Sequence, residues 1–212
     1  MIKLLLATNN QGKLAELQTL LNGLDLELLS PADLGLELQV EERGLNYLEN
    51  AVLKAAIFAD AAQMWTLADD SGLEVDVLDG APGLYSARYA PQSGASDSDR
   101  RRYLIEQLKE FPRPWKATFQ CVIALVGPEG SPIVTRGACP GDIILEDRGH
   151  GGFGYDKIFR LAANGLTMAE LTPEKKNQLS HRAQATAKLI PIIETLFENS
   201  LHPVDSGSKS GF

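Results

Sequence analysis

Hydrophobic and polar residues follow two periods in the first third of the chain, one typical of strands and one typical of helices. Apolar runs at 2–7 and 26–29 are short and continuous, so they predict two buried strands. Apolar residues recur every three or four positions at 14–21 and 45–63, which predicts two amphipathic helices. The pattern therefore predicts strand and helix in alternation through this part of the chain.

The middle of the chain is predicted to contain mostly strands, and its end two helices. Strict alternation at 73–78 predicts a half-buried strand, and the runs 117–126 and 133–138 predict an antiparallel hairpin. A charged stretch at 100–110 predicts a helix that stops before Pro112. The remaining predictions are an irregular loop at 85–98, a short strand at 143–145, a helix that starts after Thr172, and a second helix that begins at His181 after a Ser180 cap.

The predicted strand that begins at Trp65 stops at two adjacent carboxylates, Asp69 and Asp70, which Ser71 and Gly72 follow. A strand that ends in this way offers acidic oxygens on a turn at the edge of a sheet, where a ligand can reach them. Successive side chains point to opposite sides, so Asp70 could hold a hard cation or activate water while Asp69 braces the turn. The alternative is that Asp-Ser-Gly is simply favourable turn chemistry.

A polar loop at 8–13 joins the first predicted strand to the first predicted helix and contains one glycine and Lys13. The N-terminus of that helix is thereby available to phosphate oxygens. The loop is not a Walker A loop, because it has a single glycine and Leu14 follows the lysine. The alternative is a structural turn with a surface lysine. In the second predicted helix, Lys54 lies on a polar face that is either solvated or turned toward the site.

A glycine-rich segment at 148–156 surrounds two aromatic residues, Phe153 and Tyr155. So many glycines allow the backbone to approach a ligand closely. The alternative is a flexible loop, although flexible linkers usually lack such aromatic neighbours. Further along, His181 and Arg182 are predicted to lie at the positive end of the last helix.

Composition and charge are those of an ordinary globular protein. The 212 residues suffice for one substantial domain, or for one domain with two lobes around a common core. The formal net charge of −8 argues against bulk nucleic-acid binding, but it allows an anionic small ligand at a locally positive site. No segment approaches the roughly 20 apolar residues of a membrane span, and the two cysteines form no disulfide or metal pattern. We therefore expect a cytosolic, reduced protein without a membrane partner.

Six motifs stand in one order along the chain. They are Thr8-x-Asn10-x-x-Lys13, Glu49-Asn50-Ala51 with Lys54, Ala68-Asp69-Asp70-Ser71-Gly72, Gly80-Ala81-Pro82-Gly83-x-Tyr85-Ser86-Ala87-Arg88, Gly151-Gly152-Phe153-Gly154-Tyr155-Asp156 and Ser180-His181-Arg182. This series resembles the inosine triphosphate pyrophosphatase family, the RdgB-like XTP/dITP diphosphatases. The likeness covers residues 1–198, whereas 199–212 are predicted to form a disordered tail.

The resemblance implies an elongated α/β fold with a mixed β-sheet and flanking helices, in a single domain whose two lobes surround a central substrate cleft. It implies Mg²⁺-dependent hydrolysis of ITP, dITP and XTP to the monophosphate and pyrophosphate by a cytoplasmic homodimer. By motif match, Asp70 is the general base and a metal ligand, and Glu41, or its neighbour Glu42, is the second metal contact. The implied substrate-binding residues are Thr8, Asn9, Asn10, Gln11, Gly12, Lys13, Lys54, Ser71, Phe153, Gly154, Tyr155, Asp156, Lys176, His181 and Arg182.

Selection of the base must depend on position six of the purine, which is a carbonyl in hypoxanthine and xanthine but an amino group in adenine. Lys176 or Arg182 facing that carbonyl, with Asp156 accepting the N1–H, would leave adenine mismatched on both edges. One rival interpretation is a pyrophosphatase for another base, such as a modified pyrimidine. A second rival is a regulator that senses a triphosphate without cleaving it. The Asp69-Asp70 pair argues against a regulator, because carboxylates without a metal repel an anionic ligand.

Overall fold

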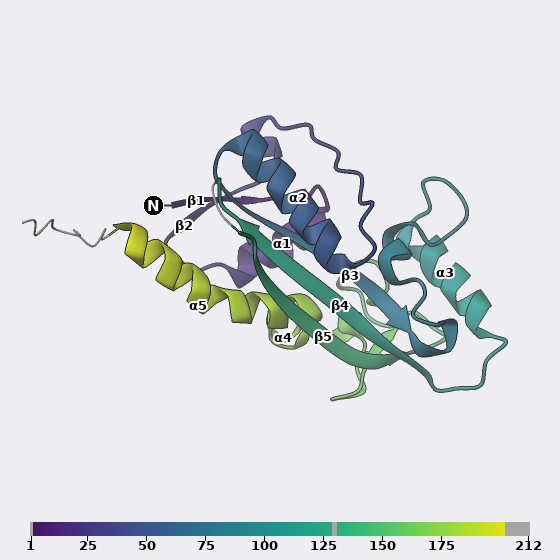
Figure 1. Ribbon diagram of the computed structural model, residues 1–212. Coiled ribbons are helices and arrows are strands. Elements are labelled where there is room, and N and C mark those ends of the chain that lie inside the picture. Colours follow the sequence, from purple (N-terminus) through teal and green to yellow (C-terminus); the bar gives the residue numbers. More distant parts are fainter. Residues whose placement is uncertain (1, 129–130, 202–212) are drawn as a thin grey trace, which may run out of the picture.

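The computed structural model describes residues 2–128 and 131–201, whose strands form one mixed sheet (Figure 1). The six strands lie in the order β2-β1-β3-β4-β5-β6. β1 (Ile2–Leu6) runs parallel to β2 (Leu26–Leu29) and β3 (Trp65–Val75), whereas β4 (Trp115–Val126), β5 (Ile133–Ile143) and β6 (Phe159–Leu161) add antiparallel pairs. The predicted α/β fold with a mixed sheet is confirmed.

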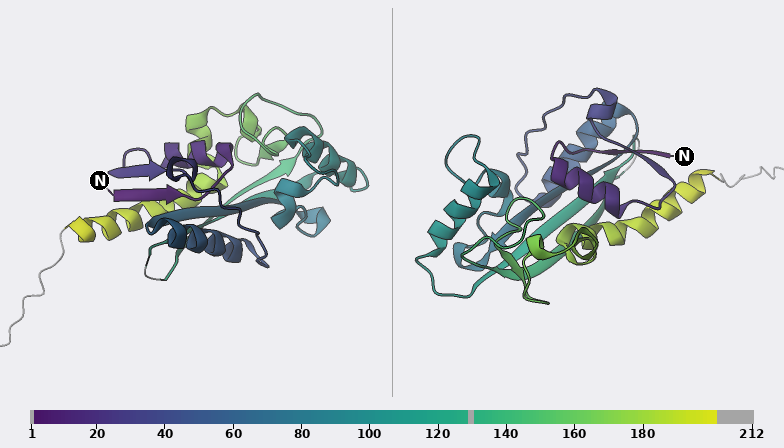
Figure 2. Two further views of the ribbon diagram at one scale, coloured as in Figure 1. Left: turned by 90° about the horizontal axis from the view of Figure 1, so that it is seen from above. Right: turned by 180° about the vertical axis from the view of Figure 1, so that it is seen from behind.

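Helices cover both faces of this sheet (Figure 2). One face carries α1 (Gln11–Leu20), α4 (Pro173–Leu179) and α5 (His181–Leu201), the other carries α2 (Tyr47–Ala62), and α3 (Asp97–Leu108) lies toward one end of the sheet. Short 3-10 helices occur at η1 (Ala32–Leu34), η2 (Asp76–Leu78), η3 (Gly83–Arg88) and η4 (Met168–Glu170).

The alternation of side chains along β1 explains the two helical layers. Leu4 and Leu6 point to one face and pack in a cluster with Leu17 of α1. Leu5 points to the other face and packs in a cluster with Ala55 of α2. Because successive strand residues face opposite sides, a continuous apolar strand requires a hydrophobic cover on both faces.

β3 is longer than the sequence pattern predicts. Asp69 and Asp70 pair with Ile123 and Val122 of β4 within the strand, so the prediction that the strand ends there is wrong. The strand predicted at 73–78 is the continuation of β3, followed by η2. Ion pairs and hydrogen bonds to Asp69, and hydrogen bonds to Asp70, allow both carboxylates to lie inside the sheet. The predicted projection of the two side chains to opposite faces is confirmed by their contacts, described below.

Several other boundaries differ from the predictions. α1 begins at Gln11, three residues earlier than predicted, so Lys13 belongs to its first turn. Asn10 caps the helix there, because its side chain accepts from the Lys13 N–H at 3.1 Å. Of the strand predicted at 143–145, only the first residue is in a strand, as the last residue of β5; 144 and 145 lie beyond it. The three-residue β6 is too short to give a periodic signal. The loop predicted at 85–98 contains most of η3 and the first two residues of α3.

The C-terminal part of the chain is helical further than expected. α5 extends to Leu201, so residues 199–201 belong to a helix, and the rest of the predicted tail lies outside the described residues. The prediction of one two-lobed domain over 1–198 stays a prediction, although all described strands share one sheet. Among the described helices, none has both the length and the apolar character that a membrane crossing requires.

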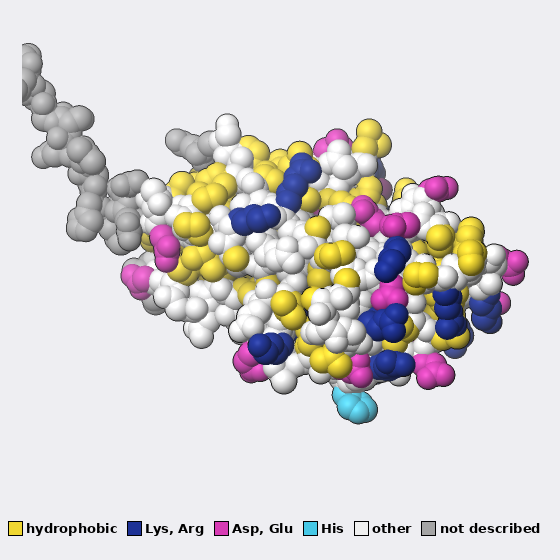
Figure 3. All heavy atoms as spheres, turned by 90° about the horizontal axis from the view of Figure 1, so that it is seen from below, with side chains coloured by type: hydrophobic (Ala, Val, Ile, Leu, Met, Phe, Trp, Pro, Cys, Tyr) yellow, Lys and Arg dark blue, Asp and Glu magenta, His cyan; other side chains and the backbone are white. Residues whose placement is uncertain are grey.

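Charged side chains of both signs share the surface shown in Figure 3. Lysine and arginine side chains lie close to aspartate and glutamate side chains there, with hydrophobic residues between them. A highly charged anion would therefore meet acidic as well as basic groups on this face. Lys13 and Lys54, in contrast, are mostly buried and paired with Asp69 and Glu42.

Candidate active site

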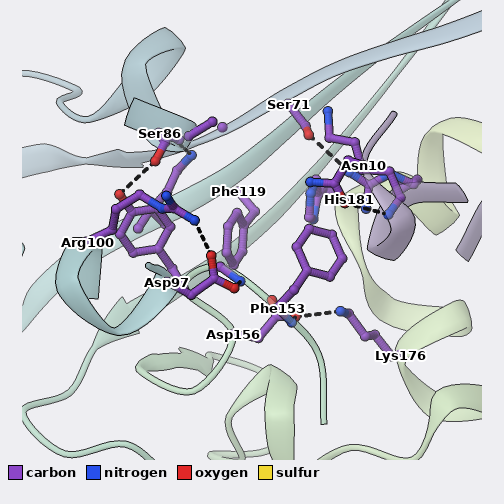
Figure 4. Close-up of a pocket in the computed structure, with 17 residues that line it drawn as sticks. Asn10, Ser71, Ser86, Asp97, Arg100, Phe119, Phe153, Asp156, Lys176 and His181 are labelled. Carbon is purple, nitrogen blue, oxygen red and sulfur yellow. Dashed lines mark hydrogen bonds and ion pairs between the residues drawn. The ribbon is translucent and has the colours of Figure 1, made fainter. Parts of the chain in front are cut away.

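Two adjacent hollows lie beside β3 and share lining residues. The shared residues are Asn10, Lys13, Ser71 and Ala87. The first hollow has an aromatic character, with Phe119 and Phe153 facing it (Figure 4). The second contains charged groups, which are Lys13, Glu42, Lys54 and Asp70. Together they form a cleft with an aromatic end and a charged end.

Asp69 faces α1 and α5, where positive charge surrounds its carboxylate. Oδ2 accepts hydrogen bonds from Arg182 Nε at 3.1 Å and Nη2 at 2.9 Å, and lies 3.1 Å from Lys13 Nζ. Burial would raise the pKa of Asp69, but the charges of Lys13 and Arg182 outweigh it and hold the pKa well below its ordinary value. Asp69 therefore stays ionised and positions two cations, so its predicted role of bracing a turn is wrong.

Asp70 faces α2 and is hydrogen-bonded to neutral donors. Oδ2 accepts from Asn50 Nδ2 at 3.0 Å, and Oδ1 accepts from the Ser71 backbone N–H at 3.0 Å. Burial raises the pKa of Asp70; the charge of Lys13 opposes this increase and that of Glu42 adds to it. Because the carboxylate also lines the charged hollow, it is accessible to a water molecule or a substrate there.

Of the two glutamates considered as a metal contact, Glu42 lies in the cleft and Glu41 does not. Glu42 lines the charged hollow, with Oε1 2.5 Å from Lys54 Nζ. The Glu41 side chain is 72% exposed and pairs with Arg43. Exposure alternates from residue to residue over 35–44, so neighbouring side chains point to opposite sides of this segment. Of the two alternatives, Glu42 is therefore the one whose side chain this structure brings into the cleft.

The charged hollow contains the oxygen ligands that magnesium prefers. The described residues contain no ready-made group of three or more His, Cys, Asp or Glu side chains for a metal. Mg²⁺, however, is usually held by one or two carboxylates together with substrate phosphates. Asp70 and Glu42 provide two such carboxylates in one hollow, and their repulsion contributes to the raised pKa of Asp70. A divalent cation between them would remove that repulsion.

The N-terminus of α1 lies at the cleft, between the two hollows. Asn10 caps the helix and lines both hollows, and Lys13 extends from the first turn toward Asp69. A Cβ on Gly12 would lie 2.5 Å from the Phe153 ring, so only glycine allows α1 to approach the aromatic wall this closely. A helix N-terminus with a lysine in its first turn favours phosphate oxygens.

The glycine-rich segment forms one wall of the aromatic hollow. Asp156 Oδ2 accepts from the Phe153 backbone N–H at 2.9 Å and lies 2.5 Å from Lys176 Nζ. Burial raises the pKa of Asp156, although the Lys176 charge opposes this increase. Lys176 Nζ also lies 4.9 Å from the centroid of the Phe153 ring, within the range of a cation–π contact. Gly152 has φ +72°, and a Cβ there would lie 2.1 Å from Asp156 Oδ2.

Glu16 of α1 connects the two ends of the cleft, and sequence reasoning did not select it. Its Oε1 lies 2.6 Å from Lys176 Nζ, and its Oε2 pairs with Arg182. Arg182 in turn reaches Asp69, which reaches Lys13. The spacing of three residues between Lys13 and Glu16 was the available signal, because such residues share a helix face. The partners of Glu16 come from the other end of the chain and give no local signal.

His181 packs against Phe119 at the back of the aromatic hollow. The two rings are stacked, with centroids 4.7 Å apart and planes inclined by 10°. Burial lowers the pKa of His181 well below its ordinary value, and the nearby charges of Arg182 and Lys176 lower it further. The imidazole is therefore neutral near pH 7. Ser180 Oγ accepts from the Ala183 N–H at 3.1 Å, as expected for a helix cap.

Most of the residues selected from sequence come together in the cleft. The hollows are lined by Thr8, Asn9, Asn10, Lys13, Lys54, Asp70, Ser71, Phe153, Gly154, Tyr155, Asp156, Lys176, His181 and Arg182. Neither lining includes Gln11 or Gly12, which lie in the first turn of α1, or the exposed Glu41. The residues that sequence reasoning missed are Glu16, Ser86, Asp97, Arg100 and Phe119.

Comparison with known proteins identifies relatives over nearly the whole chain. The family model described as the Ham1 family matches residues 4–192. The chain is 45% identical to the dITP/XTP pyrophosphatase of Escherichia coli (strain K12) over 193 residues. The aligned region covers 90% of this chain and 97% of that protein. It is 47% identical over 189 residues to the dITP/XTP pyrophosphatase of Synechocystis sp., covering 88% of this chain and 93% of that protein.

Solved structures show the same relationship. A HAM1 protein from Coxiella burnetii superposes with a TM-score of 0.83 at 38% identity, covering 92% of this chain and 100% of that one. A nucleoside-triphosphatase, dITP/XTP pyrophosphatase, from Mycobacterium abscessus gives a TM-score of 0.71 at 40% identity, covering 90% and 100%. The resemblance that the six motifs indicated is thereby confirmed, and the chain belongs to the Ham1 family.

Proposed function

We propose that this protein is a nucleoside triphosphate pyrophosphohydrolase that cleaves ITP, dITP and XTP to the monophosphate and pyrophosphate with Mg²⁺. Its relatives from Escherichia coli and Synechocystis are named dITP/XTP pyrophosphatase. The observation that carries the proposal is the pair of hollows that share Asn10, Lys13 and Ser71. A nucleotide can place its base in the aromatic hollow and its triphosphate in the charged one.

The charged hollow supplies a base for hydrolysis. In the proposed reaction water attacks the α-phosphorus, Asp70 takes a proton from that water, and pyrophosphate leaves. Asp70 lines the charged hollow and accepts hydrogen bonds from neutral donors, so its carboxylate can reach that water and take the proton. Asp70 and Glu42 would hold Mg²⁺, which would supply positive charge for the phosphates and polarise the reacting phosphoryl group.

Two lysines stabilise the leaving pyrophosphate. Lys13 lies 3.1 Å from Asp69 Oδ2, and Lys54 Nζ donates to the Asp69 backbone oxygen at 3.1 Å. Both ammonium groups are thereby held in place before substrate arrives, so little reorganisation accompanies the reaction. Asp69 acts in this step through the lysines, by positioning them at the charged hollow.

Lys176 and Asp156 select the base in this proposal. The Lys176 ammonium has three N–H donors; two are directed to Glu16 and Asp156, and the third can meet the purine carbonyl at position six. Asp156 Oδ2 already accepts from Lys176 and Phe153, so we assign the purine N1–H to Oδ1. Adenine would place its six-amino group, a donor, against the donors of Lys176. Its unprotonated N1, an acceptor, would face the Asp156 carboxylate. Such buried mismatches can give a selectivity of about 10⁴.

A nucleotide panel with product identification tests this proposal. ITP, dITP, XTP, GTP, ATP and a modified pyrimidine triphosphate are incubated with the enzyme and Mg²⁺, and matched reactions contain a chelator. We expect pyrophosphate from the first three substrates, little turnover of ATP, and no turnover with the chelator. Orthophosphate would indicate a phosphatase, preference for the pyrimidine would indicate the first rival, and binding without any product would indicate the regulator.

We also propose a cytoplasmic homodimer, because the resemblance to the family implies this assembly and location. Sedimentation equilibrium at micromolar concentration measures the mass directly. A mass near 46 kDa, about twice that of the 23.0 kDa chain, is the expected result. A concentration-independent mass of one chain would contradict the homodimer and leave the chemistry of the cleft unaffected.

A further inference from the structure

Both backbone polar groups of Gly154 are hydrogen-bonded to side chains of α3. Asp97 Oδ2 accepts from the Gly154 N–H at 2.6 Å, and Arg101 Nη1 donates to the Gly154 carbonyl oxygen at 2.9 Å. Asp97 and Arg101 are four residues apart, so they project from the same face of the helix. The contacts span 57 and 53 residues of sequence, and they therefore join α3 to the aromatic hollow by tertiary structure alone.

Arg101 is prepared for this contact by a second pair of hydrogen bonds. Its Nε and Nη2 donate to the two carboxylate oxygens of Asp147 at 2.9 and 2.6 Å, and the Arg101 residue is only 6% exposed. A guanidinium held in this bidentate way has a defined plane, which directs Nη1 toward Gly154. Asp97 also pairs with Arg100, and both side chains line the aromatic hollow opposite Lys176 (Figure 4).

The backbone conformation at Gly154 is not imposed by close packing. Its φ is +60°, but a Cβ built there would have no atom of another residue within 4 Å. Glycine is therefore required here for its left-handed backbone and not for lack of space. The two hydrogen bonds from α3 hold this conformation, and Gly154 is the second residue of the turn that the Asp156 N–H closes on the Phe153 carbonyl oxygen.

We propose that Asp97 and Arg101 are positioning residues for nucleotide recognition. Their hydrogen bonds to the Gly154 N–H and carbonyl oxygen hold Phe153 and Asp156 in the arrangement that binds the base. This inference rests on the proposed function, since it assigns the affinity for the base to a helix that carries no catalytic group. Loss of these hydrogen bonds weakens the binding of substrate and transition state equally, so KM rises while kcat is unchanged.

Steady-state kinetics of Asp97→Ala and Arg101→Ala test the inference. Each variant loses one charge-assisted hydrogen bond to the segment, so we expect KM for ITP to rise about tenfold with kcat within about twofold of wild type. The ratio of kcat/KM for ITP over ATP should fall in both variants. Asp97→Asn keeps an oxygen that can accept from the Gly154 N–H, and it should restore most of the affinity.

Two variants of the same helix serve as controls. Arg102→Ala removes an exposed arginine of α3, and Glu106→Ala removes an exposed glutamate of α3 that pairs with Lys109; neither side chain contacts Gly154. Both should keep the wild-type KM. Hydrogen exchange at the Gly154 amide gives a readout independent of turnover, and it should accelerate in Asp97→Ala but not in Arg102→Ala.

The inference and the proposed function can fail separately. If the wild-type enzyme releases pyrophosphate from ITP while Asp97→Ala and Arg101→Ala keep its KM, the inference is overturned and the function stands. An equal rise of KM in Glu106→Ala would also overturn it, because the effect would then not depend on the hydrogen bonds to Gly154.

Discussion

Two neighbouring carboxylates on opposite faces of β3 have different partners, and their pKa values shift in opposite directions. Asp69 and Asp70 are 1% and 6% exposed, so burial does not separate them. On the face covered by α1 and α5, Arg182 and Lys13 surround Asp69 and keep it ionised. On the face covered by α2, Asp70 accepts from the neutral amide of Asn50, and its pKa is raised. The partners on each face, and not the depth of burial, divide the roles of the two residues.

This difference has a consequence for the cleft as a whole. The Asp69 face contains a chain of alternating charges that runs from Lys13 through Asp69, Arg182 and Glu16 to Lys176. Each charge there has an opposite partner, which suits a rigid support for binding groups. The Asp70 face leaves a carboxylate next to Glu42, whose repulsion a cation or a proton would relieve. Reactivity is therefore expected on the Asp70 face and stability on the Asp69 face.

Asp70→Asn is expected to give the largest effect, because it removes the proposed base and proposed metal contact while keeping the shape of the side chain. We expect kcat for ITP to fall about 10⁴-fold. The free energy of unfolding should stay within about 1 kcal/mol of wild type, because Asp70 has no cationic partner in direct contact within the described residues. Pyrophosphate release is measured alongside urea denaturation. Near-wild-type turnover in this variant would remove Asp70 from the role of base.

Asp69→Asn is the matched variant on the other face, and its main effect should be on stability. Loss of the negative charge leaves the buried guanidinium of Arg182 and the ammonium of Lys13 without their shared partner. Breaking a buried ion pair in this way costs about 3–5 kcal/mol, which urea denaturation would report as a lower midpoint at unchanged slope. If Asp69→Asn and Asp70→Asn had equal stabilities, the division between the two faces would not hold.

The sequence alone predicts the alternation of this pair but not the partners that give it meaning. Period two in a strand places Asp69 and Asp70 on opposite faces without any knowledge of the fold. Arg182, however, is 113 residues from Asp69, and no local pattern reports such a contact. The same limit explains why β3 was predicted to end too early. Ser71 and Gly72 favour a turn locally, whereas pairing with β4 keeps them in a strand.

The order of the motifs predicts more of the site than any single motif. Segment 8–13, the aspartate pair and the glycine-rich segment all meet in the cleft, as the family resemblance implies. Residues that act through contacts with those motifs were missed, including Glu16 and Asp97. A charged residue on a helix has the same sequence signature whether it faces solvent or a buried partner.

Glu42→Gln and Glu41→Gln sharpen the comparison on the reactive face. Glu42 lines the charged hollow with Asp70, whereas Glu41 pairs with Arg43 in solvent. Removing a carboxylate from a metal environment typically lowers metal affinity by 10–100-fold, so Glu42→Gln should need about that much more Mg²⁺ for half-maximal activity. Glu41→Gln is the matched control and should keep the wild-type requirement. The reverse result would show that the segment over 35–44 turns over when metal and substrate bind.

His181→Phe tests how burial and the cations on the Asp69 face change the pH dependence of stability. The expected effect is about one kcal/mol. Burial and the charges of Arg182 and Lys176 keep the pKa of His181 well below 6.5 in the folded protein. Below pH 6.5 the unfolded chain binds a proton that the folded chain does not, so the free energy of unfolding falls as pH falls, by at most about 1.4 kcal/mol per unit. Phenylalanine keeps a ring against Phe119 but cannot titrate, and its stability should fall less steeply between pH 6.5 and 5.5. Identical slopes for wild type and variant would mean that the pKa of His181 is the same in the folded and unfolded chains, so that Asp69 offsets burial and the cations around it.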